Sequence, residues 1–93
     1  MSAVSAEAGY PHVTRDAGIA GGQPIVAGTR IPVATLVRAH QLGMDFDEIL
    51  VQYPSLRPVH LHAALVYYLD HKNEIDALLR DADSAPPGAD IVG

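Results

Sequence analysis

The segment from Gly22 to Val33, with the sequence GQPIVAGTRIPV, constrains the backbone more than any other part of the chain. Gly22 and Gly28 allow positive φ angles, whereas Pro24 and Pro32 fix φ and remove backbone donors. The residues between them are rich in β-branched side chains, which favour short extended segments joined by tight turns. The segment holds no acid-base pair, and we therefore expect it to serve architecture or recognition and not catalysis.

The length and composition predict one small domain with an aliphatic core. A chain of 93 residues buries only about two thirds of the surface that its unfolded form exposes, so such a fold is marginal by itself. Hydrophobic residues make up 48% of the sequence, yet there are only four Tyr, one Phe and no Trp. Because oligomerisation stabilises a small folded chain, we expect a homodimer.

Charge and cysteine content exclude several classes of protein. The absence of cysteine excludes disulfides, thiolate metal sites and a cysteine nucleophile. The net charge of −5 argues against a protein that grips phosphate backbones unaided. No apolar run approaches the roughly 20 residues of a membrane span, and the first residues lack a signal-peptide pattern, so a cytoplasmic location is expected and no membrane contact.

The chain divides into a folded part and two tails. Residues 1–9 are small and polar, and residues 82–93 are rich in Pro and Gly, so both are expected to be flexible. The domain spans residues 10–81. Its first part predicts three short strands, at Tyr10 to Arg15, Pro24 to Val26 and Thr29 to Ile31, with a turn at Ala27 and Gly28 between the last two.

The pattern changes to that of helices at Val33. A first helix is expected to bury the face that carries Val33, Leu36, Val37 and His40, and to end at Gly43.

A second helix follows at once, with Asp45 and Glu48 in the spacing of a capping box. The apolar residues on its buried face are Phe46, Ile49, Leu50 and Tyr53. Pro54 ends it.

A third helix is expected to begin at Pro58, which suits a first helical turn, and to run without interruption to about Asp81. Its first half is apolar on all sides, which is typical of a central or interfacial helix. The predicted fold class is therefore mainly α, with a short N-terminal β-hairpin and three helices.

The second and third helices, with the short break between them, have the spacing of a helix-turn-helix motif. The side chains suited to DNA are Arg57, His60 and His62 near the start of the third helix, with Arg30 and Arg38 as further cations. Apolar residues follow on the same helix, and helical pairs more commonly serve packing. Both interpretations remain open.

The sequence indicates no metal site, cofactor or enzymatic activity. His60 and His62 are two residues apart and so point to different helix faces, unlike the i, i+4 pair of a zinc-binding helix. His40 is expected to line a helix interface, and His60, His62 and His71 to be solvated or at an interface. No nucleophile elbow, zinc helix or phosphate-binding loop is found, so no catalytic residue is assigned.

The chain resembles the small prokaryotic family known as domain of unknown function 433. The resemblance covers roughly Val13 to Asp70 in continuous register. The matching motifs are Gly22-Gln23-Pro24, Ile25-Val26, Gly28 to Val33, Gly43, Tyr53-Pro54 and Ala63-Ala64-Leu65. One departure concerns Arg57-Pro58-Val59-His60, where the family commonly has Thr or Ser followed by acidic residues. The lost cap oxygen costs about 1 kcal/mol, and Pro58 partly compensates by presetting φ.

The resemblance implies a winged-helix-like or helix-turn-helix-like domain that often dimerises. Some members of the family look like antitoxins that block a partner toxin with a PIN-like ribonuclease fold, and that also bind their own promoter DNA. The residues expected at a dimer or partner interface are Ile25, Val26, Thr29, Arg30, Ile31, Val59, Val66 and Tyr67.

Two other functions stay open at this point. One is a DNA-binding transcription regulator that acts alone through the cationic residues named above. The other is a protein-binding adaptor whose Pro-rich C-terminal tail docks on another protein.

Overall fold

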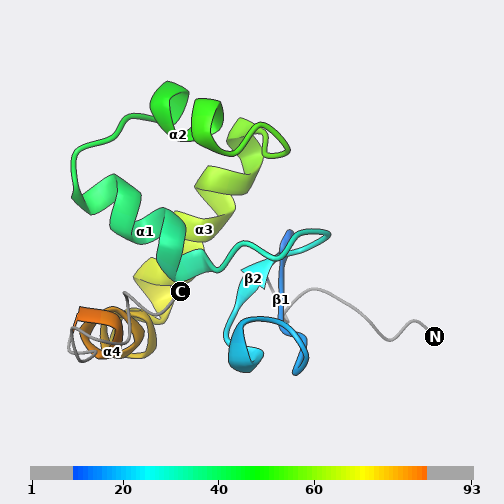
Figure 1. Cartoon of the computed structure of the whole chain (residues 1–93), viewed down its shortest axis with the longest axis vertical. Coiled ribbons are helices and arrows are strands. Elements are labelled where there is room, and N and C mark those ends of the chain that lie inside the picture. The colour runs from blue at the N-terminus through cyan, green and yellow to red at the C-terminus, as the bar shows by residue number, and fades with distance from the viewer. Residues whose placement is uncertain (1–9, 84–93) are drawn as a thin grey trace, which may run out of the picture.

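The computed structural model describes residues 10–83, which form four helices and two short strands (Figure 1). In chain order, the elements are β1 (Val13–Thr14), the 3-10 turn η1 (Ala20–Gly22), β2 (Ile25–Val26), α1 (Val33–Gln41), α2 (Phe46–Gln52), α3 (Pro58–Asp70) and α4 (Lys72–Asp83). The predicted fold class, mainly α with a short N-terminal sheet, is confirmed. Residues 1–9 and 84–93 of the predicted tails lie outside the described residues.

Helices α1 and α3 lie side by side and form the centre of the domain (Figure 1). Helix α2 crosses one end of this pair, α4 packs on α1 at the other end, and the two-stranded sheet contacts α3. Within residues 10–83, no helix is both long and apolar enough to cross a lipid bilayer.

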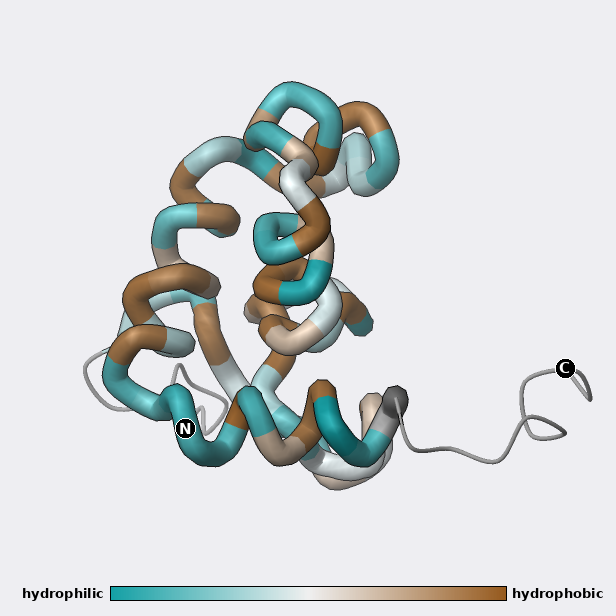
Figure 2. Tube along the Cα trace, turned by 90° about the vertical axis from the view of Figure 1, so that its left-hand side faces the viewer, coloured by the Kyte–Doolittle hydropathy of each residue, from teal (hydrophilic) through white to brown (hydrophobic). Residues whose placement is uncertain are grey.

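The core is aliphatic around one tyrosine, as the composition predicts. Its most deeply buried side chains are Val13, Ile25, Val26, Val33, Val37, Ile49, Leu61, Tyr67 and Ile75. Each helix contributes one apolar face, and the alternation of hydrophobic and hydrophilic residues is visible along α4 (Figure 2). The contacts of these faces stabilise the fold, since short helices gain most of their stability from packing.

The β-hairpin is smaller than predicted. Residue Val13 pairs with Val26, and Thr14 with Ile25, in antiparallel register. The predicted third strand, Thr29 to Ile31, is not formed. Instead, Thr29 Oγ1 donates to the Val26 carbonyl oxygen at 2.8 Å and accepts the Ile31 N–H at 3.0 Å. These bonds close a tight turn. The expected pairing persists as an isolated bridge between Ile25 and Pro32, beside which the Val26 N–H bonds to the Ile31 carbonyl oxygen at 2.9 Å.

The prediction of a single third helix is also wrong. The chain bends at His71, and this bend separates α3 from α4. The backbone of His71 has φ −132° and ψ 40°, outside the helical region. Its ring stacks on Tyr67, with centroids 4.0 Å apart. The bend turns α4 onto α1 and buries Ile75 completely.

The predicted buried face of the first helix is right except at one end. Val33, Leu36 and Val37 are buried as expected, but His40 is exposed, so it does not line a helix interface. Ala39 takes the buried position beside it. Gly43 ends the helix with φ +95°, a conformation that glycine adopts without strain.

The predicted capping box of α2 is confirmed. The Asp45 carboxylate accepts the Glu48 N–H at 2.9 Å, and the Glu48 carboxylate accepts the Asp45 N–H at 2.9 Å. Substitution Asp45→Ala is expected to lower the free energy of unfolding by about 1 kcal/mol, because an N–H of the first turn loses its acceptor. Chemical denaturation followed by circular dichroism measures the change. Asp47→Ala, in the same turn, is the control, and an equal loss there would contradict the capping role.

Candidate functional site

The N-terminus of α3 is capped by a histidine. His60 Nδ1 accepts the Arg57 N–H at 2.8 Å, so His60 takes the place that a Glu or Gln has in a capping box. The Arg57 guanidinium has no acceptor atom, and the His60 N–H bonds to the Arg57 carbonyl oxygen at 2.9 Å instead. The cap oxygen is therefore lost as expected, whereas the bond by which His60 supplies the other half of the box was not predicted.

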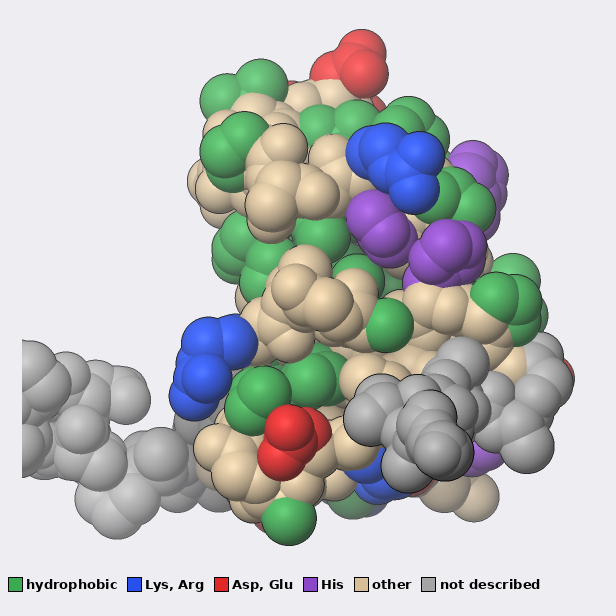
Figure 3. Space-filling model, turned by 90° about the vertical axis from the view of Figure 1, so that its right-hand side faces the viewer, with side chains coloured by type: hydrophobic (Ala, Val, Ile, Leu, Met, Phe, Trp, Pro, Cys, Tyr) green, Lys and Arg blue, Asp and Glu red, His purple; other side chains and the backbone are tan. Residues whose placement is uncertain are grey.

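Histidines gather beside this cap on one face of the domain (Figure 3). The His12 ring meets the His60 ring edge to face, with centroids 5.2 Å apart. His12 reaches it from a backbone with φ +71°, a region that non-glycine residues seldom occupy. His62 turns away to the Phe46 ring, 4.9 Å between centroids, in agreement with the expectation that His60 and His62 point to different faces.

The pKa of His60 lies below its ordinary value. Burial is the main cause, and the charges of His12 and Arg57 add to it. A lowered pKa in the folded protein means that the unfolded chain takes up the proton first as the pH falls. The contribution of neutral His60 to the free energy of unfolding is therefore fully present above the unfolded-state pKa of about 6.5. It declines as the pH falls from there toward the folded-state pKa.

Replacing His60 with glutamine is expected to flatten this pH dependence. The glutamine amide oxygen can still accept the Arg57 N–H, but it does not titrate. Urea denaturation at pH 8 and pH 5.5 measures the difference in the free energy of unfolding, which should shrink in the variant. His40→Gln, on the exposed side of α1, is the matched control. An unchanged difference in His60→Gln would contradict the assignment.

An apolar surface lies next to the histidines. We define the outer face of α3 as Val59, Ala63, Val66 and Leu69. Val59, Val66 and Leu69 are 41%, 53% and 66% exposed. A hollow of about 260 Å³ opens here, lined by Tyr10, Pro11, His12, Val59, His62, Ala63 and Val66. Valine and leucine side chains exposed together on one helix are unusual for a surface that faces only water.

The structure separates the residues predicted for a partner interface. Ile25, Val26 and Tyr67 are at most 2% exposed, so the prediction is wrong for them: the protomer core uses them and leaves no side-chain surface. The remaining residues reach the surface at two places. Val59 and Val66 lie on the outer face of α3, whereas Thr29, Arg30 and Ile31 lie in the turn after β2. Leu69 was not predicted at this surface, although its place three residues after Val66 puts it beside that residue on the helix.

The residues predicted for DNA contact are divided as well. Arg57, His60 and His62 lie together at the start of α3. Arg30 is exposed in the turn after β2. Arg38 belongs to α1 and donates from Nη2 to the Leu79 carbonyl oxygen of α4, at 3.5 Å. The start of α3 is thus the one place where the structure brings three of these five residues together.

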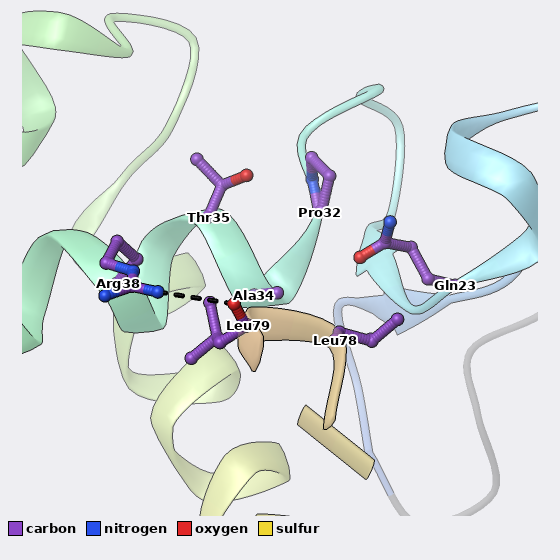
Figure 4. A pocket seen from close by; sticks show the side chains of 7 residues that line it. All are labelled: Gln23, Pro32, Ala34, Thr35, Arg38, Leu78 and Leu79. Carbon is purple, nitrogen blue, oxygen red and sulfur yellow. Dashed lines mark hydrogen bonds between the residues drawn. The ribbon is translucent and has the colours of Figure 1, made fainter. Parts of the chain in front are cut away.

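A second hollow, of about 280 Å³, lies along the contact between α1 and α4 (Figure 4). Pro32, Ala34, Leu78 and Leu79 supply apolar walls, and Gln23, Thr35 and Arg38 supply polar atoms at the edge. We call this contact the α1–α4 seam. Among residues 10–83, no cluster of His, Asp or Glu could hold a metal ion.

Comparison with known proteins identifies a family with this architecture. The family described as "Protein of unknown function (DUF433)" matches residues 13–68. The structure is similar to the crystal structure of a DUF433 member protein from Anabaena variabilis ATCC 29413, with a TM-score of 0.72 and 38% sequence identity. The match covers 74% of this chain and 68% of that chain. No curated protein matches the sequence.

Proposed function

The chain belongs to the DUF433 family, and we propose that it is a non-enzymatic, antitoxin-like regulator. It would act in the cytoplasm as a homodimer and bind a partner protein through the outer face of α3. The exposure of Val59, Val66 and Leu69 carries this proposal. Contiguous apolar surface rimmed by polar residues is typical of protein interaction sites. Here the rim includes Arg57 and His62.

The charge of the chain favours a basic partner. A net charge of −5 attracts a cationic surface and speeds its association. Enzymes that cleave RNA present such surfaces to their substrate. The family resemblance adds the PIN-like ribonuclease fold as the class of toxin. The outer face of α3 would supply the contact with that enzyme, and the net charge of the whole chain would supply the long-range attraction.

Co-expression with the product of the adjacent gene tests this function. We expect the two proteins to co-purify through affinity and size-exclusion steps, and we expect this chain to inhibit cleavage of a single-stranded RNA. The ribonuclease alone and the ribonuclease with an unrelated acidic protein are the controls. Absence of both a complex and inhibition would remove the antitoxin proposal.

A transcription regulator that binds DNA is the second candidate, and the grouping of Arg57, His60 and His62 at the start of α3 favours it. This helix follows α2 across a short break, as a recognition helix does. If Arg57 contacts a base, Arg57→Ala weakens specific binding by about 1 to 3 kcal/mol. Mobility shifts with the promoter of the chain's own gene, at roughly physiological salt, measure this loss. Binding that occurs only at low salt would count against it.

A further inference from the structure

The bend at His71 divides a stretch of sequence that contains no helix breaker. From Val59 to Asp83 there is neither glycine nor proline, and the pattern of this stretch predicts one uninterrupted helix. In such a helix, the N–H groups of Lys72, Asn73 and Glu74 would bond to carbonyl oxygens of the preceding turn. The bend interrupts this ladder, because α4 begins anew at Lys72. The bent form must therefore be held by contacts other than helical hydrogen bonds.

One of these contacts exists only because the helix bends. Tyr68 Oη donates to Asp76 Oδ1 at 2.9 Å. Eight residues separate the two, and in a straight helix they would lie about 12 Å apart along the axis. Straightening the chain at His71 separates these groups and breaks the hydrogen bond.

A second group of contacts comes from the N-terminal segment. Arg15 Nη2 donates to Tyr67 Oη at 2.8 Å and to Glu74 Oε2 at 2.7 Å, and so spans α3 and α4 across the bend. The side chains of this ion pair are about one third exposed, and water weakens an ion pair so placed. At the bend itself, the His71 ring stacks on Tyr67, and its Nδ1 lies 3.1 Å from the Tyr67 carbonyl oxygen.

The apolar contact of α4 with α1 is incomplete. Ile75 is fully buried, but Leu78 and Leu79 are only half-buried and line the hollow of the α1–α4 seam (Figure 4). Well-packed interiors leave few voids larger than a water molecule, and loosely packed elements open at lower free energy than the rest of a fold. Helix α4 is thus attached through the buried Ile75, the partly buried Leu78 and Leu79, and polar contacts.

We propose that two copies of this chain exchange α4. In the exchanged form, α3 and α4 join into one continuous helix through His71, and α4 of each copy packs on α1 of the other. Every contact of Ile75, Leu78 and Leu79 with α1 is then remade between copies, as in other domain-swapped dimers. The backbone N–H groups of Lys72, Asn73 and Glu74 then regain helical hydrogen bonds, whereas the Tyr68–Asp76 hydrogen bond is lost.

The exposed residues before the bend support a second copy as the occupant. Val66 and Leu69 lie within five residues of His71, on the last turns of α3. Two long helices that cross near the hinge bring the side chains at this end of the outer face of α3 against each other. Val59 and Ala63, at the start of α3, stay accessible to the partner protein. The inference rests on the homodimer of the proposed function and specifies how its two copies are joined. It does not depend on the ribonuclease.

Cysteine cross-linking distinguishes an exchanged dimer from a side-by-side dimer, and the chain has no native cysteine to interfere. Thr35 of α1 and Leu78 of α4 line the same hollow. Thr35→Cys and Leu78→Cys are made in separate full-length chains, which are mixed, unfolded, refolded together and treated with a short bismaleimide. We expect a covalent dimer that joins residue 35 of one chain to residue 78 of the other, identified by mass spectrometry. Each variant treated alone is the control.

Hinge variants supply a second measurement. His71→Ala removes the stacking on Tyr67 and favours a helix, so the dimer fraction in light scattering should rise several-fold. Insertion of Gly-Gly after His71 disfavours a continuous helix and should lower the fraction by a similar factor. A dimer without the 35–78 cross-link, or a monomer in both hinge variants, would overturn the exchange. Failure to capture the ribonuclease would leave these results unaffected and would contradict only the antitoxin function.

Discussion

Replacing Tyr67 with alanine is expected to lower the free energy of unfolding by about 3 to 5 kcal/mol, the range found when a large buried aromatic side chain is removed. The Tyr67 side chain is fully buried. Its ring packs edge to face on Tyr10, with centroids 5.0 Å apart, and it stacks on His71. Alanine removes these contacts together and leaves a cavity where the strands, α3 and the bend meet. Chemical denaturation at one fixed chain concentration measures the change.

Two further variants separate packing from hydrogen bonding at this position. Tyr67→Phe keeps the ring and removes only the hydroxyl, which accepts from Arg15 at 2.8 Å and donates to Glu74 at 3.5 Å, so a smaller loss of about 1 kcal/mol is expected. Val51→Ala, at a side chain that is 80% exposed on α2, should change the free energy of unfolding by less than about 0.5 kcal/mol. A loss at Tyr67→Ala no larger than that at Val51→Ala would contradict the central place of Tyr67.

Substitution Val66→Glu is expected to weaken association at the outer face of α3 by a factor of about 30 or more. Val66 is half exposed in the protomer, so the glutamate stays hydrated there and the fold tolerates it. In a complex the carboxylate would lose its water to an apolar surface, which costs about 2 kcal/mol or more. Light scattering measures the change for the proposed homodimer, and titration calorimetry measures it for the proposed complex with the product of the adjacent gene.

The same change at Val51 is the matched control. Val51 is more exposed than Val66 and lies on α2, outside the outer face of α3. Val51→Glu changes the net charge by the same amount, so it reports the effect of charge without the effect of position. Equal affinity for the Val66 and Val51 variants would show that the outer face of α3 is not the interface.

Local signals in the sequence were enough to predict where most helices begin and end. Asp45 and Glu48 cap α2 through atoms only three residues apart, Pro58 begins α3, and Gly43 ends α1. Each of these effects depends on neighbours within one turn, so the order of the residues determines it. The period of apolar residues likewise placed Leu36, Val37 and Ile49 in the core.

The candidate site was predicted only in part. Arg57, His60 and His62 are neighbours in the sequence, and they are neighbours in the structure. The contribution of His12 was missed, because its ring reaches His60 from the strand segment, 48 positions earlier in the chain. The burial of Ile25, Val26 and Tyr67 was missed for a related reason: an apolar residue suits a core and an interface equally well, and the residue type does not distinguish them.

By itself, the sequence determined the helical class, the capping box of α2, the start of α3 at Pro58, and the turns at Gly28 and Gly43. Only the tertiary structure decided the bend at His71 and the side of α3 that faces water. Among the contacts at the bend, Arg15 bonds to Tyr67 and Glu74, which lie 52 and 59 positions further along the chain. The spacing of apolar residues in a helix reflects contacts about one turn apart. It therefore cannot predict a contact with an arginine from a distant segment of the chain.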